Sequence, residues 1–357
     1  MQQSVRSDLA GDVLAVVSQS GPTVSFFDAA TDRHLETVDV LAEPHELCFD
    51  PVQRLIWCAN TYRSGYYHAN SGRRSELTVI DADTRRIVEV VDLAPEQGPH
   101  GLALDTVRGR LYVSVEGSGS RPGGVVVVDT ATRRPIGRID TGAPGPHWFV
   151  VDPAGRAGYA SNKEAPFVSV VDLDRGVLTD RIEVPGSEGI AVSADGARVF
   201  VAAPYGSFAN RGRIPGDSPE EAPATGIRVI DTASASVTAL LPTEHVVFPV
   251  HVTATGRLLV GELRMEPDPA SRLGRQAAGR LTVFSAAGHE RLGTVEVGRF
   301  PLTITSSADG RIGYVACVSS STVDVVDLDA MRPLARLDVA RRGEPGAHGM
   351  AYLPKPG

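Results

Sequence analysis

Apolar and polar residues alternate along most of the chain in short runs, the pattern of β-strands that bury one face. The clearest unit is an apolar strand ending in aspartate, then a short polar turn and a second strand, as in LTVIDADTRRIVEVVDL from Leu77. Aspartate favours such turns because its carboxylate accepts hydrogen bonds from nearby backbone amides. Seven such hairpins occur, marked by Asp28, Asp81, Asp129, Asp172, Asp231, Ser285 and Asp327.

A second pair of apolar strands lies between successive hairpins, as in HGLALDTVRGRLYVSV from His100. Four strands in a unit of roughly 40–60 residues are typical of propeller blades. We therefore predict an all-β fold, a seven-bladed β-propeller with four antiparallel strands per blade, forming one domain over 1–357. The C-terminal HGMAYL has no partner strands after it, and the N-terminal unit lacks an innermost strand. We expect about 10–40 and 346–354 to form the closing blade, which removes exposed sheet edges.

The second strand of several units carries a four-residue motif: WCAN from Trp57, YVSV from Tyr112, YASN from Tyr159, FVAA from Phe200 and YVAC from Tyr314. These motifs resemble the YVTN-repeat propellers, a group of YncE-like and lactonase-like seven-bladed proteins. The resemblance covers nearly the whole chain. It implies the fold strongly and function weakly, because propellers host many unrelated activities.

The start of each innermost strand carries the candidate chemistry. A Pro/Gly turn precedes one variable residue, and in chain order that residue is His45, His100, His147, Glu188, Val250, Leu302 and His348. Four of the nine histidines of the chain thus fall at one position of the repeat. Innermost strands line the central channel, so we expect these side chains to meet at one mouth of it, with Val250 and Leu302 filling an apolar sector.

Imidazoles gathered in this way predict a transition-metal site held by His45, His100, His147, His348 and Glu188. Imidazole and carboxylate ligands suit copper, iron or zinc, whereas magnesium and calcium prefer oxygen ligands. The arrangement resembles the hubs of carotenoid-cleaving oxygenases, nitrous oxide reductase and virginiamycin B lyase, which implies a metal more than any one reaction. A c-type haem is not expected, since Cys-x-x-Cys-His is absent. The alternative is that each histidine caps its own turn.

Other residues near the hub are candidates for catalysis or substrate binding. Glu188, Glu262 and His251 are the candidate catalytic groups, with Glu262 at the YVTN asparagine position and His251 beside Val250. Trp148 follows His147 and is expected to border the site. Long loops after three second strands predict pocket walls, because function often lies on such loops. Their candidate substrate-binding residues are Tyr62, Arg63, Tyr66, Tyr67, His68, Tyr205 and Arg264. Solvated insertions are the alternative reading of these loops.

Composition narrows the function classes. The formal charge of −8 argues against a nucleic-acid partner, and no segment has the length of a membrane span. Three cysteines are too few for a disulfide framework, and no secretory signal is evident, so a cytoplasmic setting is expected. The leading prediction is a metal-dependent enzyme acting on a small molecule, with redox chemistry slightly favoured over lyase or hydrolase chemistry. The alternatives are a non-catalytic binding propeller and a lactonase-like hydrolase using Glu188 and Glu262. The oligomeric state stays open.

Overall fold

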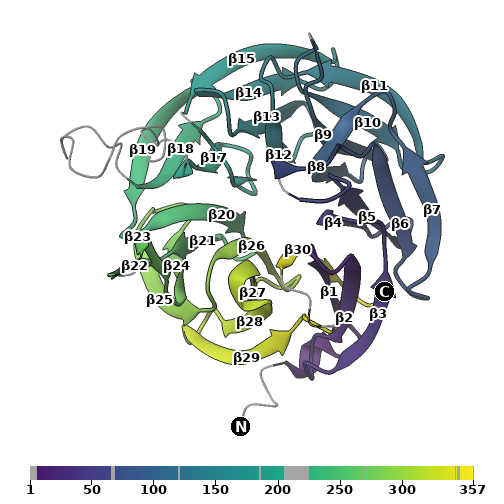
Figure 1. The fold of residues 1–357 in the computed structure, drawn as a ribbon. Coiled ribbons are helices and arrows are strands. Elements are labelled where there is room, and N and C mark those ends of the chain that lie inside the picture. The colour runs from purple at the N-terminus through teal and green to yellow at the C-terminus, as the bar shows by residue number, and fades with distance from the viewer. Residues whose placement is uncertain are drawn as a thin grey trace.

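Seven four-stranded antiparallel sheets surround a central axis in the computed structural model, which confirms the predicted propeller (Figure 1). The structure describes residues 6–65, 69–119, 121–184, 186–204, 225–269, 271–341, 343 and 346–356. In every blade the strands run from the axis outward, joined by hairpins, as the alternating apolar pattern predicted.

The innermost strands are β4 (Pro44–Asp50), β8 (Gln97–Asp105), β12 (Pro146–Val151), β16 (Ile190–Val192), β20 (Val246–Val252), β26 (Pro301–Ser306) and β30 (Ala347–Leu353). The second strands are β5 (Leu55–Asn60), β9 (Arg110–Glu116), β13 (Ala157–Asn162), β17 (Arg198–Ala202), β21 (Arg257–Leu263), β27 (Ile312–Cys317) and β1 (Val13–Ser18). The third strands are β6 (Glu76–Asp81), β10 (Gly124–Asp129), β14 (Phe167–Asp172), β18 (Gly226–Asp231), β24 (Gly279–Ser285), β28 (Thr322–Asp327) and β2 (Thr23–Asp28). The outermost strands are β7 (Ile87–Asp92), β11 (Arg134–Asp140), β15 (Val177–Glu183), β19 (Ser236–Pro242), β25 (Arg291–Val297), β29 (Arg332–Asp338) and β3 (His34–Asp39).

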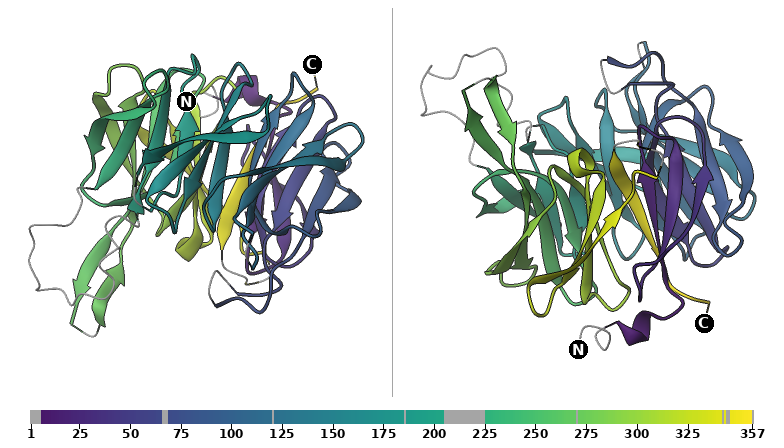
Figure 2. Two further views of the ribbon diagram at one scale, coloured as in Figure 1. Left: turned by 90° about the horizontal axis from the view of Figure 1, so that it is seen from above. Right: turned by 60° about the horizontal axis from the view of Figure 1, so that its bottom comes forward.

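A few short elements lie outside the blades. The hairpin of β22 (Met265–Asp268) and β23 (Ser271–Gln276) projects from the disc on the face away from both chain ends (Figure 2). Two 3₁₀ turns are η2 (Ser7–Leu9) and η5 (Val318–Ser320). In the described part of the chain, no helix is long and apolar enough to cross a membrane.

The two ends of the chain close the ring. β30 pairs antiparallel with β1, with Ala351 opposite Ala15 and Leu353 opposite Val13. The closing blade is therefore built from the last innermost strand and the first three strands, as predicted. The hydroxyl of Tyr352 also donates to the carboxylate of Asp12, and this bond ties the two ends together beyond the ladder.

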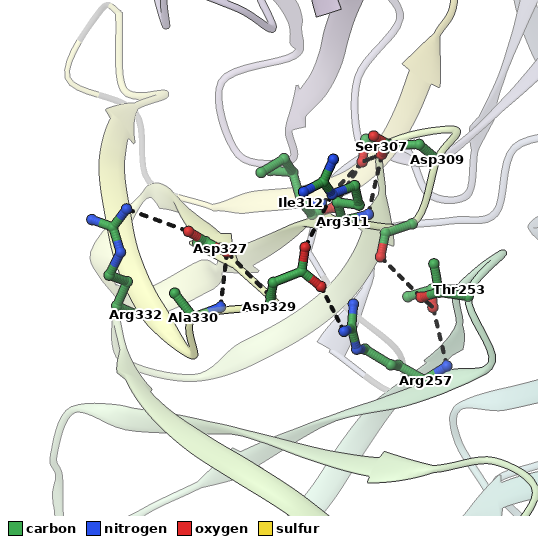
Figure 3. A network of polar contacts seen from close by, with 12 residues as sticks. Thr253, Arg257, Ser307, Asp309, Arg311, Ile312, Asp327, Asp329, Ala330 and Arg332 are labelled. Atoms are coloured by element: carbon green, nitrogen blue, oxygen red, sulfur yellow. Dashed lines mark hydrogen bonds and ion pairs between the residues drawn. The ribbon is translucent and has the colours of Figure 1, made fainter. Parts of the chain in front are cut away.

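Polar contacts between blades reinforce the ring at its outer loops. Asp327 starts the turn after β28, and its Oδ1 accepts the backbone amides of Asp329 and Ala330 at 3.1 and 3.0 Å. Asp329 in turn accepts hydrogen bonds from Arg311 of its own blade at 3.0 Å and from Arg257 of the preceding blade at 2.6 Å (Figure 3). The turn aspartates thus do more than reverse the chain, since one turn also anchors the neighbouring blade.

The entry of every innermost strand except β16 is irregular, and this irregularity shapes the hub. In β4 the pairing jumps from Pro44 opposite Asn60 to Leu47 opposite Cys58, which leaves two residues outside the regular ladder. β8, β12 and β20 show the same kind of jump. Such bulges redirect side chains. They also bring blades close together, because a Cβ added at Gly101 would lie 2.5 Å from the carbonyl oxygen of His147.

Candidate metal centre

The four repeat histidines meet at the mouth of the central channel. Their ring centroids are 3.7 Å apart for His45 and His100, 3.7 Å for His100 and His147, and 4.2 Å for His45 and His348. The side chains come from β4, β8, β12 and β30, and each lies in the irregular stretch near the start of its strand. All four residues are between 1% and 3% exposed, so they form one buried cluster.

Two carboxylates flank the histidines. Oε1 of Glu188 lies 3.3 Å from Nδ1 of His147. Oε1 of Glu46 lies 3.3 Å from Nδ1 of His348 and 3.5 Å from Nδ1 of His45. Glu46 is a hub residue that the sequence analysis missed. Regular strand alternation would turn it away from its neighbour His45, but both residues fall in the bulge of β4 and both reach the cluster.

The donor atoms are close enough to share an ion. One ligand atom each from His45, His100 and His147 lies within 4.8 Å of the other two, and the same holds for His45, Glu46 and His348. The two sets share His45. Among the described residues, these are the groups in which three or more such side chains meet at metal-binding distances.

Burial keeps three of the four imidazoles neutral. It lowers the pKa of His45, His100 and His147 well below the ordinary value, and other cationic groups nearby lower these pKa values further. Burial also raises the pKa of Glu46. Nδ1 of His45 is buried and has no hydrogen bond within the described structure. A neutral imidazole with an unused ring nitrogen is the form that binds a metal ion, so the cluster fits a metal.

In the alternative role, turn capping, each histidine would bond the backbone carbonyl groups of its own turn. Nδ1 of His348 faces Glu46, and it also lies 3.5 Å from Oγ1 of Thr303. Nδ1 of His45 faces the same carboxylate. Nδ1 of these two imidazoles therefore contacts other side chains of the hub and not the carbonyl groups of their own turns.

The apolar sector of the hub has a different composition from the predicted one. In β20 the ladder places Val247 opposite Glu262, as Pro44 lies opposite Asn60 in β4. Phe248 therefore occupies the position equivalent to His45, and Val250 lies two residues farther along the strand. The expected place of Val250 in the ring was wrong because Pro249 falls inside the bulge, whereas the prolines of the other blades precede it. Leu302 follows Pro301 as predicted.

Lys163 is a second hub residue that sequence reasoning missed. Its Nζ lies 3.5 Å from Oε1 of Glu188, and its side chain is 11% exposed. Burial lowers the pKa of this lysine to about 8, although the Glu188 carboxylate acts in the opposite direction. The residue directly follows the YASN motif, and it is one of two lysines in a chain rich in arginine. That scarcity was the only signal available in the sequence.

A cavity of about 410 Å³, lined in part by charged side chains, opens onto the cluster. His100, His147 and Lys163 line its hub end, and the Pro/Gly-rich loop at 142–146 forms one wall. The rest of the lining carries charges of both signs, from Arg73, Arg121, Glu116 and Glu164. We call this space the hub pocket. Its lining suits a small polar molecule.

The other two catalytic candidates lie outside the cluster. Both oxygens of Glu262 bind within its own blade, since Oε2 accepts the backbone amide of His245 at 3.0 Å and the other oxygen accepts the hydroxyl of Thr282. This is the bonding role of the asparagine of the YVTN motif, as Asn60 shows with Thr78. Nε2 of His251 lies 3.0 Å from Oγ of Ser306, farther along the channel.

The predicted substrate-binding residues are placed in several environments. Trp148 lies against the hub, with its ring centroid 6.4 Å from that of His147. Tyr62 is buried behind the hub pocket and donates its hydroxyl to Oε1 of Glu116 at 2.5 Å. Arg63 is exposed, and Arg264 pairs with Glu296 at 3.5 Å, away from the pocket lining. Tyr66, Tyr67, His68 and Tyr205 lie outside the described residues.

No family model matches the chain. The uncharacterised protein YncE of Salmonella typhi and that of Salmonella typhimurium are each 27% identical to this chain over 143 residues. The match spans 38% of this chain and 38% of the length of each relative. This likeness agrees with the YVTN-type repeats read from the sequence.

Solved structures match over almost the whole chain. A protein of unknown function from Desulfotomaculum acetoxidans has a TM-score of 0.68 at 12% identity and covers 97% of this chain and 99% of its own. Hydrazine synthase of Kuenenia stuttgartiensis has a TM-score of 0.61 at 16% identity, with 91% and 90% covered. The dihydro-heme d1 dehydrogenase NirN has a TM-score of 0.57 at 14% identity, with 92% and 64% covered. At these identities the comparisons show a shared propeller fold, with a low-identity relation to YncE.

Proposed function

We propose that this protein is a metal-dependent enzyme that acts on a small polar molecule bound in the hub pocket. The observation that carries the proposal is the buried cluster of four histidines with Glu46 and Glu188 at its edge. Buried ionisable groups are costly unless they are paired or bind metals, and groups with perturbed pKa values concentrate at functional sites. Six buried ionisable side chains at one end of a channel are hard to explain as packing.

The donor set indicates which metals would fit. His45, His100 and His147 would form one set of ligands, and His45, Glu46 and His348 the other. Imidazoles with a minority of carboxylates suit iron, copper or zinc. When bound, iron or copper supplies redox chemistry, and zinc polarises a carbonyl or activates water. The predominance of imidazole over carboxylate favours the redox alternative.

The remaining hub residues would bind and orient the substrate. Lys163 and Glu188 form a buried ion pair at the hub end of the pocket, where the lysine ammonium can hold an anionic or carbonyl oxygen. Arg73 and Arg121 add positive charge toward the outside of the pocket. The substrate is therefore proposed to be small and polar, with at least one oxygen for Lys163.

Two of the matched folds support an enzymatic role in a limited way. Hydrazine synthase and the dihydro-heme d1 dehydrogenase NirN are enzymes by name, so this architecture is used for catalysis elsewhere. A shared fold does not transfer a reaction, because function depends on the site. The proposal therefore depends on the histidine cluster and not on these neighbours.

Metal analysis tests the proposal. Protein made without an affinity tag should be reconstituted anaerobically with Fe(II), Cu(II) and Zn(II) in turn, desalted and measured by mass spectrometry. We expect stoichiometric retention of one of these metals. The double variant His100→Ala/His147→Ala should lose it, and the matched double variant His34→Ala/His245→Ala, which changes two histidines outside the hub, should keep it. A wild-type protein that retains none of the three metals overturns the proposal.

A second candidate is a metal-independent hydrolase or lyase, and the Lys163–Glu188 pair is the observation that favours it. A carboxylate and a lysine of lowered pKa can exchange protons with a substrate. Glu262 gives this candidate little support, since both of its oxygens are bonded within its blade. If Glu188→Gln abolishes activity in protein shown to be free of metal, this second candidate replaces the first.

A further inference from the structure

The central channel holds a second cavity, and we infer that it is a separate binding site for a small, largely apolar molecule carrying one hydrogen-bonding group. The cavity measures about 320 Å³ and is lined by residues of β8, β12, β16, β20 and β26. We call it the channel chamber. Its lining contains no charged side chain, whereas the hub pocket is lined by several, so the two spaces should bind different classes of molecule.

Most of the side chains that line the channel chamber are apolar, although polar atoms also contribute a substantial part of its surface. They include Leu104, Trp148, Val150, Val192, Val252 and Ile304. No carboxylate, lysine or arginine is among the lining residues. Removing apolar surface from water is favourable by about 25 cal/mol for each Å², so such a space favours an apolar occupant. A mostly apolar cavity with a few polar groups is the usual form of a small-molecule site.

His251 supplies the polar group that would orient the occupant. His251 is among the residues that line the chamber, and its Nε2 is held 3.0 Å from Oγ of Ser306. This contact orients the ring and occupies Nε2. Nδ1 is then the ring nitrogen that remains for a hydrogen bond with a bound molecule. A neutral imidazole has both a donor and an acceptor nitrogen, so it can bind a hydroxyl or a carbonyl group. His251 is not a member of the histidine cluster, and the proposed reaction does not use it.

The chamber adjoins the histidine cluster without being part of it. Trp148 lines the chamber and follows His147 directly in β12. Thr303 also lines the chamber, and its Oγ1 lies 3.5 Å from Nδ1 of His348. A molecule in the chamber would therefore lie beside Trp148 and Thr303, two residues that adjoin the cluster. The site does not require a bound metal, so it can be tested on metal-free protein.

Calorimetric titration of the metal-free protein with β-naphthol tests the inference. This probe has an apolar body and one hydroxyl group. We expect one site, with affinity about tenfold weaker in His251→Leu, the order of one neutral hydrogen bond. Naphthalene, which lacks the hydroxyl and is measured by competition, should bind wild type and His251→Leu alike. Ala191→Phe, which fills the chamber, should abolish binding of β-naphthol.

Two controls keep the result interpretable. His34→Leu removes an imidazole that contacts a threonine hydroxyl on an outermost strand, and it should leave the affinity unchanged. Ala191→Val adds less volume than phenylalanine, and it should weaken binding in proportion if the larger variant fails to fold. The inference is overturned if β-naphthol does not bind the wild type, or if it binds His251→Leu and the Ala191 variants as tightly as the wild type. Neither result depends on whether the protein holds a metal.

Discussion

Oε1 of Glu46 lies 3.3 Å from Nδ1 of His348, so a carboxylate from the first complete blade faces an imidazole from the last strand of the chain. Both side chains are almost fully buried. A hydrogen-bonded carboxylate orients an imidazole and raises its basicity, and loss of such a partner typically reduces metal affinity 10–100-fold. We therefore expect Glu46 to raise the metal affinity of the hub, and its substitution is the first test.

Glu46→Gln is expected to reduce the metal affinity of the hub by about 10–100-fold while the propeller stays folded. The amide keeps the shape of the side chain but loses the negative charge. Affinity can be measured by competition with a chelator of known strength. Glu244→Gln, which changes a carboxylate on an exposed loop, should leave the affinity unchanged. Equal affinities in the two variants would show that Glu46 does not support the metal.

Gly101→Ala is expected to destabilise the protein by about 2–4 kcal/mol, in the range of overpacked or strained positions. The added methyl group would meet the carbonyl oxygen of His147 at 2.5 Å and the Cα of Trp148 at 2.8 Å. Urea unfolding measures the effect. Gly145→Ala is the matched control because a Cβ there has no heavy atom within 4 Å. Similar losses at both positions would contradict the close contact between blades at the hub.

The free energy of unfolding is expected to decrease in acid, in part because of His251. Burial lowers its pKa from 6.5 to about 4, so the folded protein resists taking up a proton that the unfolded chain accepts. Stability should therefore fall as the pH drops from about 6.5 toward 4, by roughly 2–3 kcal/mol for this residue. His251→Gln removes this contribution. Urea unfolding at pH 7 and pH 4.5 should show a smaller loss in the variant, whereas parallel losses would contradict the assignment.

Asp329→Asn is expected to weaken the contact between two neighbouring blades by no more than about 1 kcal/mol. The side chain pairs with Arg257 and Arg311 but is 44% exposed, so water and salt screen the interaction. Thermal unfolding at low and high salt should show a difference that shrinks as salt is added. A loss that does not depend on salt would mean that Asp329 acts through its turn and not through its charge.

The fold could be predicted from the sequence because propeller blades leave a strong local signal. Alternating apolar strands recur in every unit, and turn aspartates such as Asp81 in all units but the one with Ser285. The missing innermost strand of the first unit matches the extra strand at the C-terminus. The repeat also predicted the histidine cluster, because one position at the start of the innermost strands carries His45, His100, His147 and His348. Each of these inferences needs only the repeat and the rule that innermost strands line the axis.

The parts that could not be predicted depend on local irregularity. Glu46 reaches the cluster only because β4 bulges, and Phe248 replaces Val250 in the ring because Pro249 falls inside its bulge. Lys163 turns toward Glu188 from a short loop whose sequence carries no motif. Glu262 looked chemically active by residue type, but its bonds with Thr282 and His245 emerge only in three dimensions.

The ring closure described above has a consequence for assembly. His348 lies on the final strand, and that strand joins the sheet begun by the first residues of the fold. The ligand set of His45, Glu46 and His348 therefore stays incomplete until the chain has been synthesised as far as β30 and that strand has paired with β1. An ion held by this set would mark a propeller whose closing blade has formed, so loading of the hub would report successful ring closure.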